Sequence, residues 1–306
     1  MFFDVILLVI GLILLVKFSS ITIQNAVKLS RLTGVSEMTI GFILIAVSTS
    51  IPEMTIAIIS SLRGESLLSF GNLVGANISN LALIFGILGM IGFAIKKKDL
   101  IEIYEAVFLT SIVAVFAIAL RQLDFAFGIF LLILFYVFAK GAVKSGIKGR
   151  SKFSGLKTIG ITKAIFYVII SVAVVIISAK IVTDSSIGLA QSLGIAESLV
   201  GATILALGTT LPELSVGIMA IRKGNVGLAV GDGLGSIVAN LTLVLGIAAL
   251  IHPIGISFSQ VSLLWMLLIV NGIFILLASR LKFGKKEGAA LLAIYILYLL
   301  IVINIG

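Results

Sequence analysis

Two glutamates stand directly after prolines inside long apolar stretches of the chain. They are Glu53, which follows Pro52, and Glu213, which follows Pro212. A charge in the middle of a membrane span costs several kcal/mol, so we expect both carboxylates to face the protein interior or a cavity. The same local pattern occurs twice, which favours a functional role for these glutamates over a structural one.

Residues that can supply oxygen ligands precede each glutamate in the sequence. Because proline has no backbone N–H, it frees a carbonyl about one turn earlier in a helix. The hydroxyl-bearing residues Thr49, Ser50, Thr209 and Thr210 lie near that turn. Sites built only from oxygen suit hard cations such as Ca²⁺ and Na⁺. The chain has no cysteine and one histidine, which argues against a site for softer metals.

The two Pro–Glu segments belong to an internal repeat. Residues 34–88 align with residues 194–248 when the sequence is shifted by 160 positions, and 17 of these 55 positions are identical. This number exceeds what an apolar composition gives by chance, and it indicates two copies of one structural unit. The identical residues in the first copy are Gly34, Glu37, Gly41, Ala46, Thr49, Pro52, Glu53, Ile58, Gly64, Leu68, Gly71, Gly75, Asn80, Leu81, Leu83, Gly86 and Ile87.

The composition is that of a membrane protein. Of the 306 residues, 60% are hydrophobic and 11% are charged, against about 25% charged in an average soluble domain. This excludes a soluble globular enzyme, a disordered chain and a disulfide scaffold, and no nucleic-acid-binding motif accompanies the basic residues. A bilayer core takes roughly 20 apolar residues per helix. We predict ten spans, with Asp184 at the outer end of the sixth, at about 3–27, 38–60, 67–93, 102–120, 124–142, 161–183, 198–220, 226–250, 257–278 and 288–305.

The basic residues orient the chain and divide it in two. With the central basic loop in the cytoplasm, 18 of the 22 Lys and Arg residues fall on the cytoplasmic side. This predicts an integral protein of a prokaryotic plasma membrane with both termini outside. The predicted parts are a five-helix repeat at 1–145, a basic linker at 146–157 and a second five-helix repeat at 158–306. Because five is odd, the second copy is inverted, as in many secondary transporters; a duplicated scaffold without transport is the alternative.

The spans that follow the glutamates repeat as well. Residues 71–80 align with 231–240, and both stretches contain small residues that allow close helix approach. The asparagine that ends each stretch can supply an amide oxygen to an ion or a hydrogen bond between helices. Asp232 stands where the repeat would place the mate of Asn72. It can serve as a proton site, as a charge at a cavity mouth or as an ion-pair partner.

These paired segments resemble the α-repeats of the Ca²⁺/cation antiporter superfamily, and most closely its prokaryotic Na⁺/Ca²⁺ exchanger-type members. The resemblance covers the whole chain and implies an all-α fold with four repeat helices around the ions. For Ca²⁺, the predicted ligands are Glu53, Glu213, the carbonyls of Thr49 and Thr209, and the amides of Asn80 and Asn240. For flanking monovalent ions, the implied ligands are Ser50, Thr210, Ser236 and the carbonyls of Ala46 and Ala206. The candidates for proton or gating roles are Glu53, Glu213, Asp232 and Asn72.

The sequence departs from the exchanger pattern in ways that bear on the counter-ion. Na⁺/Ca²⁺-type members commonly have Asp at the position of Asn240 and Ser at that of Ala76. Two glutamates carry a charge of −2, which one Ca²⁺ balances, and two protons can neutralise them on the return leg because desolvation and mutual repulsion favour protonated carboxyls. The sequence therefore favours Ca²⁺/H⁺ antiport by alternating access, with Na⁺/Ca²⁺ exchange at the same site as the alternative. We predict no cofactor and no obligate protein or nucleic-acid partner.

Two other functional classes fit the sequence less well. Intramembrane hydrolases need a Gly-x-Gly-Asp segment with a second aspartate, a Ser–His pair, or a His-Glu-x-x-His motif, and the chain has none of these in a suitable place. A passive channel needs no counter-ion, whereas a closed ring of ligands between inverted repeats fits alternating access better. We therefore predict a transporter and not an enzyme.

Overall fold

The computed structural model describes residues 2–32, 46–92, 99–146, 158–222, 226–279 and 283–305, and within these ranges the chain is almost entirely helical. Two apolar helices in this part of the chain are shorter than 18 residues, at Ile51–Leu62 and Phe125–Gly141. Seven helices there are long and apolar enough to cross a membrane: Ser66–Ile91, Leu100–Leu120, Ile169–Leu193, Glu197–Arg222, Ala229–Ile251, Phe258–Ala278 and Lys285–Ile303. The count of ten spans stays a prediction, because residues 38–45 of the second predicted span lie outside the described ranges.

Several of the helices are interrupted. The first half contains α1 (Phe2–Leu32), α3 (Ala46–Thr49), α4 (Ile51–Leu62), α5 (Ser66–Ile78), η2 (Ser79–Ile84), α6 (Phe85–Ile91), α7 (Asp99–Leu120), β1 (Gln122–Leu123) and α8 (Phe125–Gly146). The second half contains α9 (Thr158–Leu193), α10 (Glu197–Val200), η3 (Gly201–Leu205), α11 (Ala206–Thr209), α12 (Leu211–Arg222), α13 (Val226–Ala239), η4 (Asn240–Val244), α14 (Leu245–Ile251), β2 (Ile254–Gly255), α15 (Phe258–Ala278) and α16 (Lys285–Ile305). The η segments are π-helical, and β1 pairs with β2 in an antiparallel sense.

Helix α9 is longer than the sequence predicts, because it continues past Asp184 to Leu193. The helix therefore does not end at Asp184, whereas the position of Asp184 at the outer end of the membrane span stays a prediction. Its carboxylate pairs with the guanidinium of Arg63, so the charge is satisfied at the side of a continuing helix. The helix ends instead before Gly194, which has a φ of +67°, and the amide of Ile195 donates to the carbonyl of Ala190 at 3.1 Å. This is a common glycine-dependent helix end.

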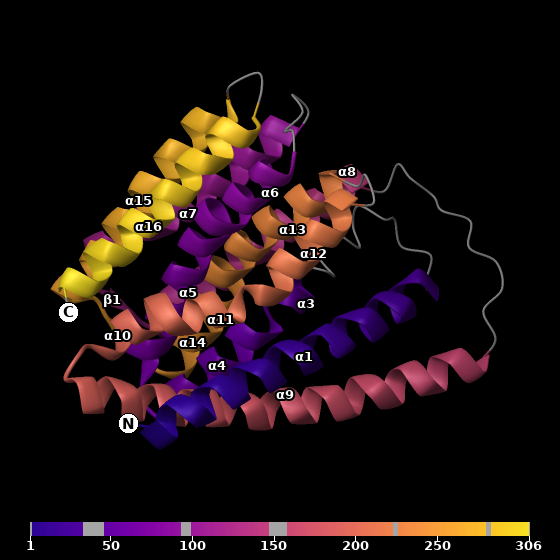
Figure 1. Cartoon of the computed structure of the whole chain (residues 1–306), viewed down its shortest axis with the longest axis horizontal. Coiled ribbons are helices and arrows are strands. Elements are labelled where there is room, and N and C mark those ends of the chain that lie inside the picture. The colour runs from indigo at the N-terminus through magenta and orange to yellow at the C-terminus, as the bar shows by residue number, and fades with distance from the viewer. Residues whose placement is uncertain are drawn as a thin grey trace.

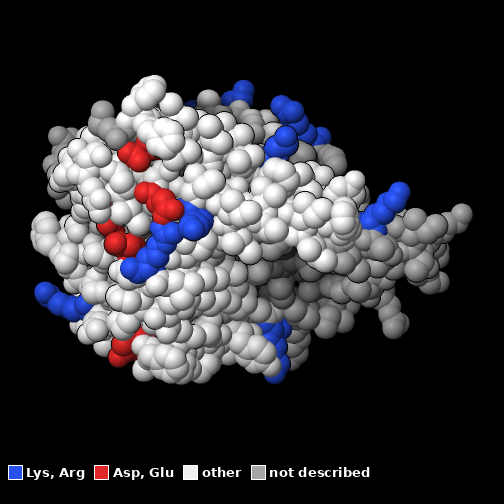
Figure 2. Space-filling view, turned by 90° about the horizontal axis from the view of Figure 1, so that it is seen from below, with Lys and Arg blue, Asp and Glu red and all other residues white. Residues whose placement is uncertain are grey.

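Helices α1 and α9 run side by side along one edge of the molecule (Figure 1). A Cβ on Gly11 of α1 would lie 2.8 Å from Cγ2 of Val182 on α9, which shows how closely the two helices approach. They share an apolar cluster that also contains Ile56 of α4 and Leu68 of α5. Acidic side chains gather toward one end of the face seen from below, whereas Lys and Arg side chains are spread along it (Figure 2). The pair is therefore a layer packed against the rest of the fold through its own core.

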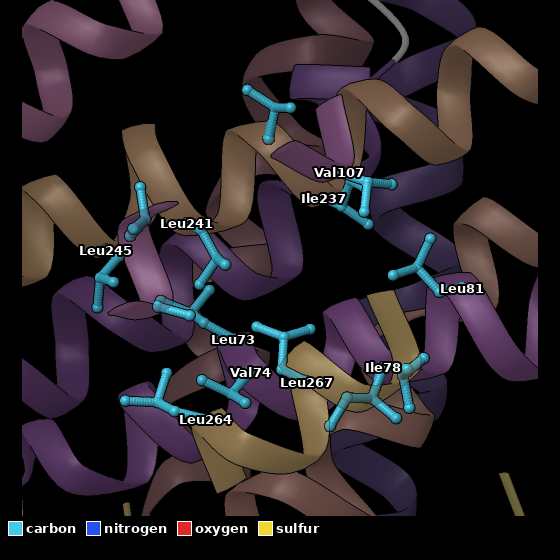
Figure 3. Close-up of a cluster of buried hydrophobic side chains, with 14 of the residues drawn as sticks. Leu73, Val74, Ile78, Leu81, Val107, Ile237, Leu241, Leu245, Leu264 and Leu267 are labelled. Carbon is cyan, nitrogen blue, oxygen red and sulfur yellow. The ribbon is translucent and has the colours of Figure 1, made fainter. Parts of the chain in front are cut away.

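A second and larger core surrounds α5 and α13. Figure 3 shows part of it, where side chains from α5, η4 and α15 converge. Leu73, Val74, Leu241, Leu264 and Leu267 are each at most 1% exposed. Because interiors are close-packed, this core fixes the rotation of α5 and α13 and hence the direction in which their polar residues point.

The shift of 160 positions that relates the two halves also relates contacts in the structure. On α16, a Cβ on Gly288 would lie 2.7 Å from the carbonyl oxygen of Gly86, and on α8 a Cβ on Gly128 would lie 2.9 Å from that of Gly246. Adding 160 to 86 and to 128 gives 246 and 288, so these are the same contact made twice. The side-chain amide of Asn271 also donates at 2.8 Å to Ser111, whose number is lower by 160. The correspondence thus extends beyond the segments where identity reveals it.

Candidate ion site

Two helices break at matching positions. Helix α3 gives way to α4 at Ser50 (φ −79°, ψ 9°), and α11 gives way to α12 at Thr210 (φ −82°, ψ 0°). Pro52 and Pro212 lie in the first turn after each break. Proline is tolerated there because the first amides of a helix have no acceptor within the helix. The Pro–Glu pattern therefore starts a new helix in both copies.

Both glutamates are buried in these first turns. Glu53 is 0% exposed and Glu213 is 1% exposed, and none of their four carboxylate oxygens has a hydrogen-bond partner within the described part of the chain. The hydroxyl of Thr209 is near Glu53, and those of Thr49 and Ser236 are near Glu213. The positive end of a helix dipole favours an anion at this place. The oxygens thus keep lone pairs with which they can coordinate a cation.

The threonines that precede the breaks reach across to the other half of the molecule. The hydroxyl of Thr49 donates to Oδ1 of Asp232 at 3.2 Å and lies 3.1 Å from Oγ of Ser236. The hydroxyl of Thr209 donates to Oδ1 of Asn72, also at 3.2 Å. These contacts connect α3 with α13 and α11 with α5. The segments that the repeat selects in the sequence therefore meet in space.

The two predicted asparagine ligands lie in the π-helical segments. Asn80 is within η2 and Asn240 begins η4. Both are 0% exposed, and neither the nitrogen nor the oxygen of either amide has a hydrogen-bond partner among the described residues. One-turn π-helical insertions are frequent at functional sites. Their role as amide ligands remains a prediction.

The predicted flanking ligands differ between the two halves. Oγ of Ser50 is buried and has no hydrogen-bond partner among the described residues. By contrast, the hydroxyl of Thr210 donates to the carbonyl of Ala206 at 3.0 Å, and this carbonyl also accepts the amide of Thr210 at 3.1 Å. Ala46 begins α3, at the position matching Ala206. The carbonyl of Ala206 therefore has little acceptor capacity left in this conformation.

Sequence reasoning missed two polar contacts near the site. The side-chain amide of Asn77 donates to the carbonyl of Ile237 at 2.8 Å, and the hydroxyl of Tyr298 donates to the carbonyl of Ala202 at 2.6 Å. A Cβ on Gly75 would overlap the backbone of Ala202, so α5 and η3 touch at this place. Asn77 was overlooked because the matching residue is an isoleucine. Tyr298 lies in a last span without a motif, and only its hydroxyl within an apolar run could have drawn attention.

One acidic side chain of the site, that of Glu213, has two acidic neighbours. Glu213 interacts electrostatically with both Glu53 and Asp232. The described residues contain no cluster of three or more His, Cys, Asp or Glu side chains that could hold a metal ion. A cation bound here would therefore draw on hydroxyl, carbonyl or amide oxygens as well as carboxylates, which is common for hard cations.

The comparisons with known proteins cover nearly the whole chain. A model of the family described as "Sodium/calcium exchanger protein" matches residues 3–143 and 163–304. The chain is 29% identical to the sodium/calcium exchanger MaX1 of Methanosarcina acetivorans over 98% of each chain, and 31% identical to the inner membrane protein YrbG of Escherichia coli over 81% of this chain and 79% of YrbG. A solved structure of the sodium-calcium exchanger NCX_Mj superposes with a TM-score of 0.71, at 26% identity and 97% coverage of each chain. The chain thus belongs to the sodium/calcium exchanger family of membrane transport proteins, and to the Ca²⁺/cation antiporter superfamily that its motifs resemble.

Proposed function

We propose that this protein exchanges Ca²⁺ for Na⁺ across the membrane by alternating access, with Glu53 and Glu213 as the charged ligands of Ca²⁺. The observation that carries this proposal is the pair of buried carboxylates at the starts of α4 and α12, whose oxygens have no hydrogen-bond partner among the described residues. An unsatisfied buried polar group is costly, so a fold retains it where a ligand supplies the missing interaction. Membership of the exchanger family supports the same assignment.

Alternating access requires a site that can open to either side. We infer two inverted five-helix repeats at 1–145 and 158–306, joined by the cytoplasmic linker 146–157, with both termini outside. The equivalent glycine contacts of α6 with α16 and of α14 with α8 support this plan. So do the contacts of Thr49 with Asp232 and of Thr209 with Asn72, which relate the halves across the site. In an inverted pair of this kind, each repeat can take the conformation of the other, which moves the opening to the opposite side.

Charge balance explains why such a site exchanges ions and does not release one alone. The ionised pair of Glu53 and Glu213 carries −2, and moving that charge through a low-dielectric interior uncompensated is costly. One Ca²⁺ or two monovalent cations balance it. The names of the relatives favour Na⁺ as the monovalent ion.

The second candidate is Ca²⁺/H⁺ antiport, which the sequence alone favours. One observation supports it: the asparagines at 80 and 240 are both neutral, so the pair of glutamates meets no further acid in those helix turns. Protons need no additional ligands, whereas Na⁺ does. The two candidates share the Ca²⁺ site and differ only in the counter-ion.

Uptake of ⁴⁵Ca²⁺ into proteoliposomes decides between them. Vesicles loaded with Na⁺ at equal internal and external pH should accumulate Ca²⁺, and the Glu213→Gln variant should not rise above protein-free vesicles. Vesicles without Na⁺ but with an acidic interior should remain at background. Uptake in the second condition together with none in the first would overturn Na⁺ exchange and establish the proton reading. Ca²⁺ uptake that occurs without internal Na⁺ and without a pH gradient would indicate a passive channel.

A further inference from the structure

Two clusters of four residues correspond position by position across the site. The Asp232 cluster consists of Thr49, Glu213, Asp232 and Ser236. The Asn72 cluster consists of the residues 160 positions away, Thr209, Glu53, Asn72 and Ala76. The threonine hydroxyl donates to residue 232 in one cluster and to residue 72 in the other, at 3.2 Å in both. The geometry is therefore conserved between the halves while the chemistry is not.

The difference between the clusters is one charge and one hydroxyl. Asp232 replaces an amide with a carboxylate, and Ser236 replaces the methyl group of Ala76 with a hydroxyl. Both changes add oxygen ligands, and both fall on the same side of the site. The Asp232 cluster thus offers two carboxylates and two hydroxyls, whereas the Asn72 cluster offers one of each together with an amide.

The buried position of Asp232 needs a compensating charge. Its side chain is 1% exposed. The interactions found for it are with the hydroxyl of Thr49 and, electrostatically, with the carboxylate of Glu213, and neither balances a negative charge. Both oxygens of Glu213 also have no hydrogen-bond partner among the described residues. Buried charges are normally paired or bound to an ion, so the cluster has the composition of a cation subsite.

We propose that the Asp232 cluster is a second cation subsite, filled by Na⁺ when the protein carries sodium, and that Asp232 is its specific charged ligand. This rests on the proposed function, in which Ca²⁺ is balanced by Glu53 and Glu213. The one remaining charge, on Asp232, matches a monovalent cation. Glu213 is shared between the two subsites because it interacts with both Glu53 and Asp232. Oxygen ligands of this kind suit hard cations.

The test compares two kinds of flux in the same proteoliposomes. The first is ⁴⁵Ca²⁺ uptake driven by internal Na⁺, measured against Na⁺ concentration, and the second is Ca²⁺/Ca²⁺ exchange without Na⁺. In Asp232→Asn, which restores the residue found at position 72, the Hill coefficient for Na⁺ should fall by about one and the half-saturating Na⁺ should rise about tenfold. Ca²⁺/Ca²⁺ exchange should stay within about twofold. Asp232→Glu should retain the steep Na⁺ dependence, as should Glu105→Gln, which removes an exposed carboxylate on α7.

The outcomes separate this inference from the proposed function. If wild-type vesicles show no Na⁺-driven uptake, the proposed function fails, and the subsite fails with it. If wild type is driven by Na⁺ and Asp232→Asn shows the same steepness and half-saturation, only the subsite is refuted. The subsite is also refuted if Asp232→Asn and Asp232→Glu each lose Na⁺-driven uptake and Ca²⁺/Ca²⁺ exchange to the same extent while eluting as a single species in detergent. Asp232 would then serve the Ca²⁺ site or the fold.

Discussion

Two regions of this protein differ in how their buried polar groups are satisfied. At the starts of α4 and α12, the carboxylate oxygens of Glu53 and Glu213 have no hydrogen-bond partner among the described residues. Between α7 and α15, the side-chain nitrogen of Asn271 instead donates to Ser111 at 2.8 Å, although its Oδ1 has no hydrogen-bond partner among the described residues. The first region lies where repeated helices break, and the second where continuous helices pack.

We expect the carboxylates of the first region to be kept for transport and the contact of the second region to be kept for stability. Leaving a buried polar group unpaired costs about 1–3 kcal/mol, and more for a charge. A pairing between helices contributes about 0.5–1.5 kcal/mol. Variants of the unpaired region should therefore lose transport while keeping or gaining stability. Variants of paired polar groups should lose stability first.

The largest effect is expected for Glu213→Gln or Glu53→Gln. Each substitution keeps the shape of the side chain and removes one charged ligand. Losing one partner of a buried charged interaction costs about 2–5 kcal/mol, so Ca²⁺ affinity should fall roughly thirtyfold to several thousandfold. Because the variant no longer buries that charge without a partner, its melting temperature in detergent without Ca²⁺ should equal or exceed that of wild type. A clear drop in melting temperature would show that the carboxylates support the fold, and would remove the division between the regions.

The next effect concerns the contact of α5 with η3, at Gly75. A Cβ there would overlap the backbone of Ala202, so Gly75→Ala must push two helices apart. Overpacking of this kind typically costs about 1–3 kcal/mol, and the melting temperature should fall accordingly. The matched control is Gly272→Ala on α15, where a Cβ would meet no atom within 4 Å. Alanine should be neutral or slightly stabilising there, because glycine is a poor helix former. Equal effects of the two variants would contradict this prediction.

A smaller loss of stability is expected for Tyr298→Phe. The tyrosine hydroxyl donates to the carbonyl of Ala202 at 2.6 Å from a side chain that is 3% exposed. Removing one buried hydrogen bond costs about 1 kcal/mol. The control is Tyr136→Phe on α8, whose side chain is 63% exposed. Thermal melts of both variants in detergent check the difference. A melting temperature equal to that of wild type in Tyr298→Phe would show that this contact contributes nothing to the fold.

Much of this arrangement could be predicted from the sequence because the chain carries its pattern twice. The Pro–Glu segments, the helices that follow them and the family all follow from residues that recur 160 positions apart. The length of α9 could not be predicted, because the partner that satisfies Asp184 is Arg63, which lies far away in the sequence. The contact of Asn77 with Ile237 joins two residues that the repeat aligns with each other, but only Asn77 has a polar side chain, so the repeat did not reveal it. Contacts that break the repeat are the ones that only a three-dimensional structure supplies.

The smallest effect is expected for the ion pair of Arg63 with Asp184, which joins the end of α4 to α9. Its side chains are 33% and 49% exposed, so solvent screens the attraction and we expect a coupling of at most about 1 kcal/mol. A double-mutant cycle with Arg63→Ala and Asp184→Ala, followed by thermal melts at low and high salt, measures it. Transport should change less than about twofold, because neither side chain contributes to the ion site. A loss of transport that matches Glu213→Gln, with stability intact, would place this outer pair among the groups kept for transport. Such a result would mean that α9 must move relative to α4 for ions to pass. A polar group would then matter for transport because of its place along the transport path, and not because it lacks a partner.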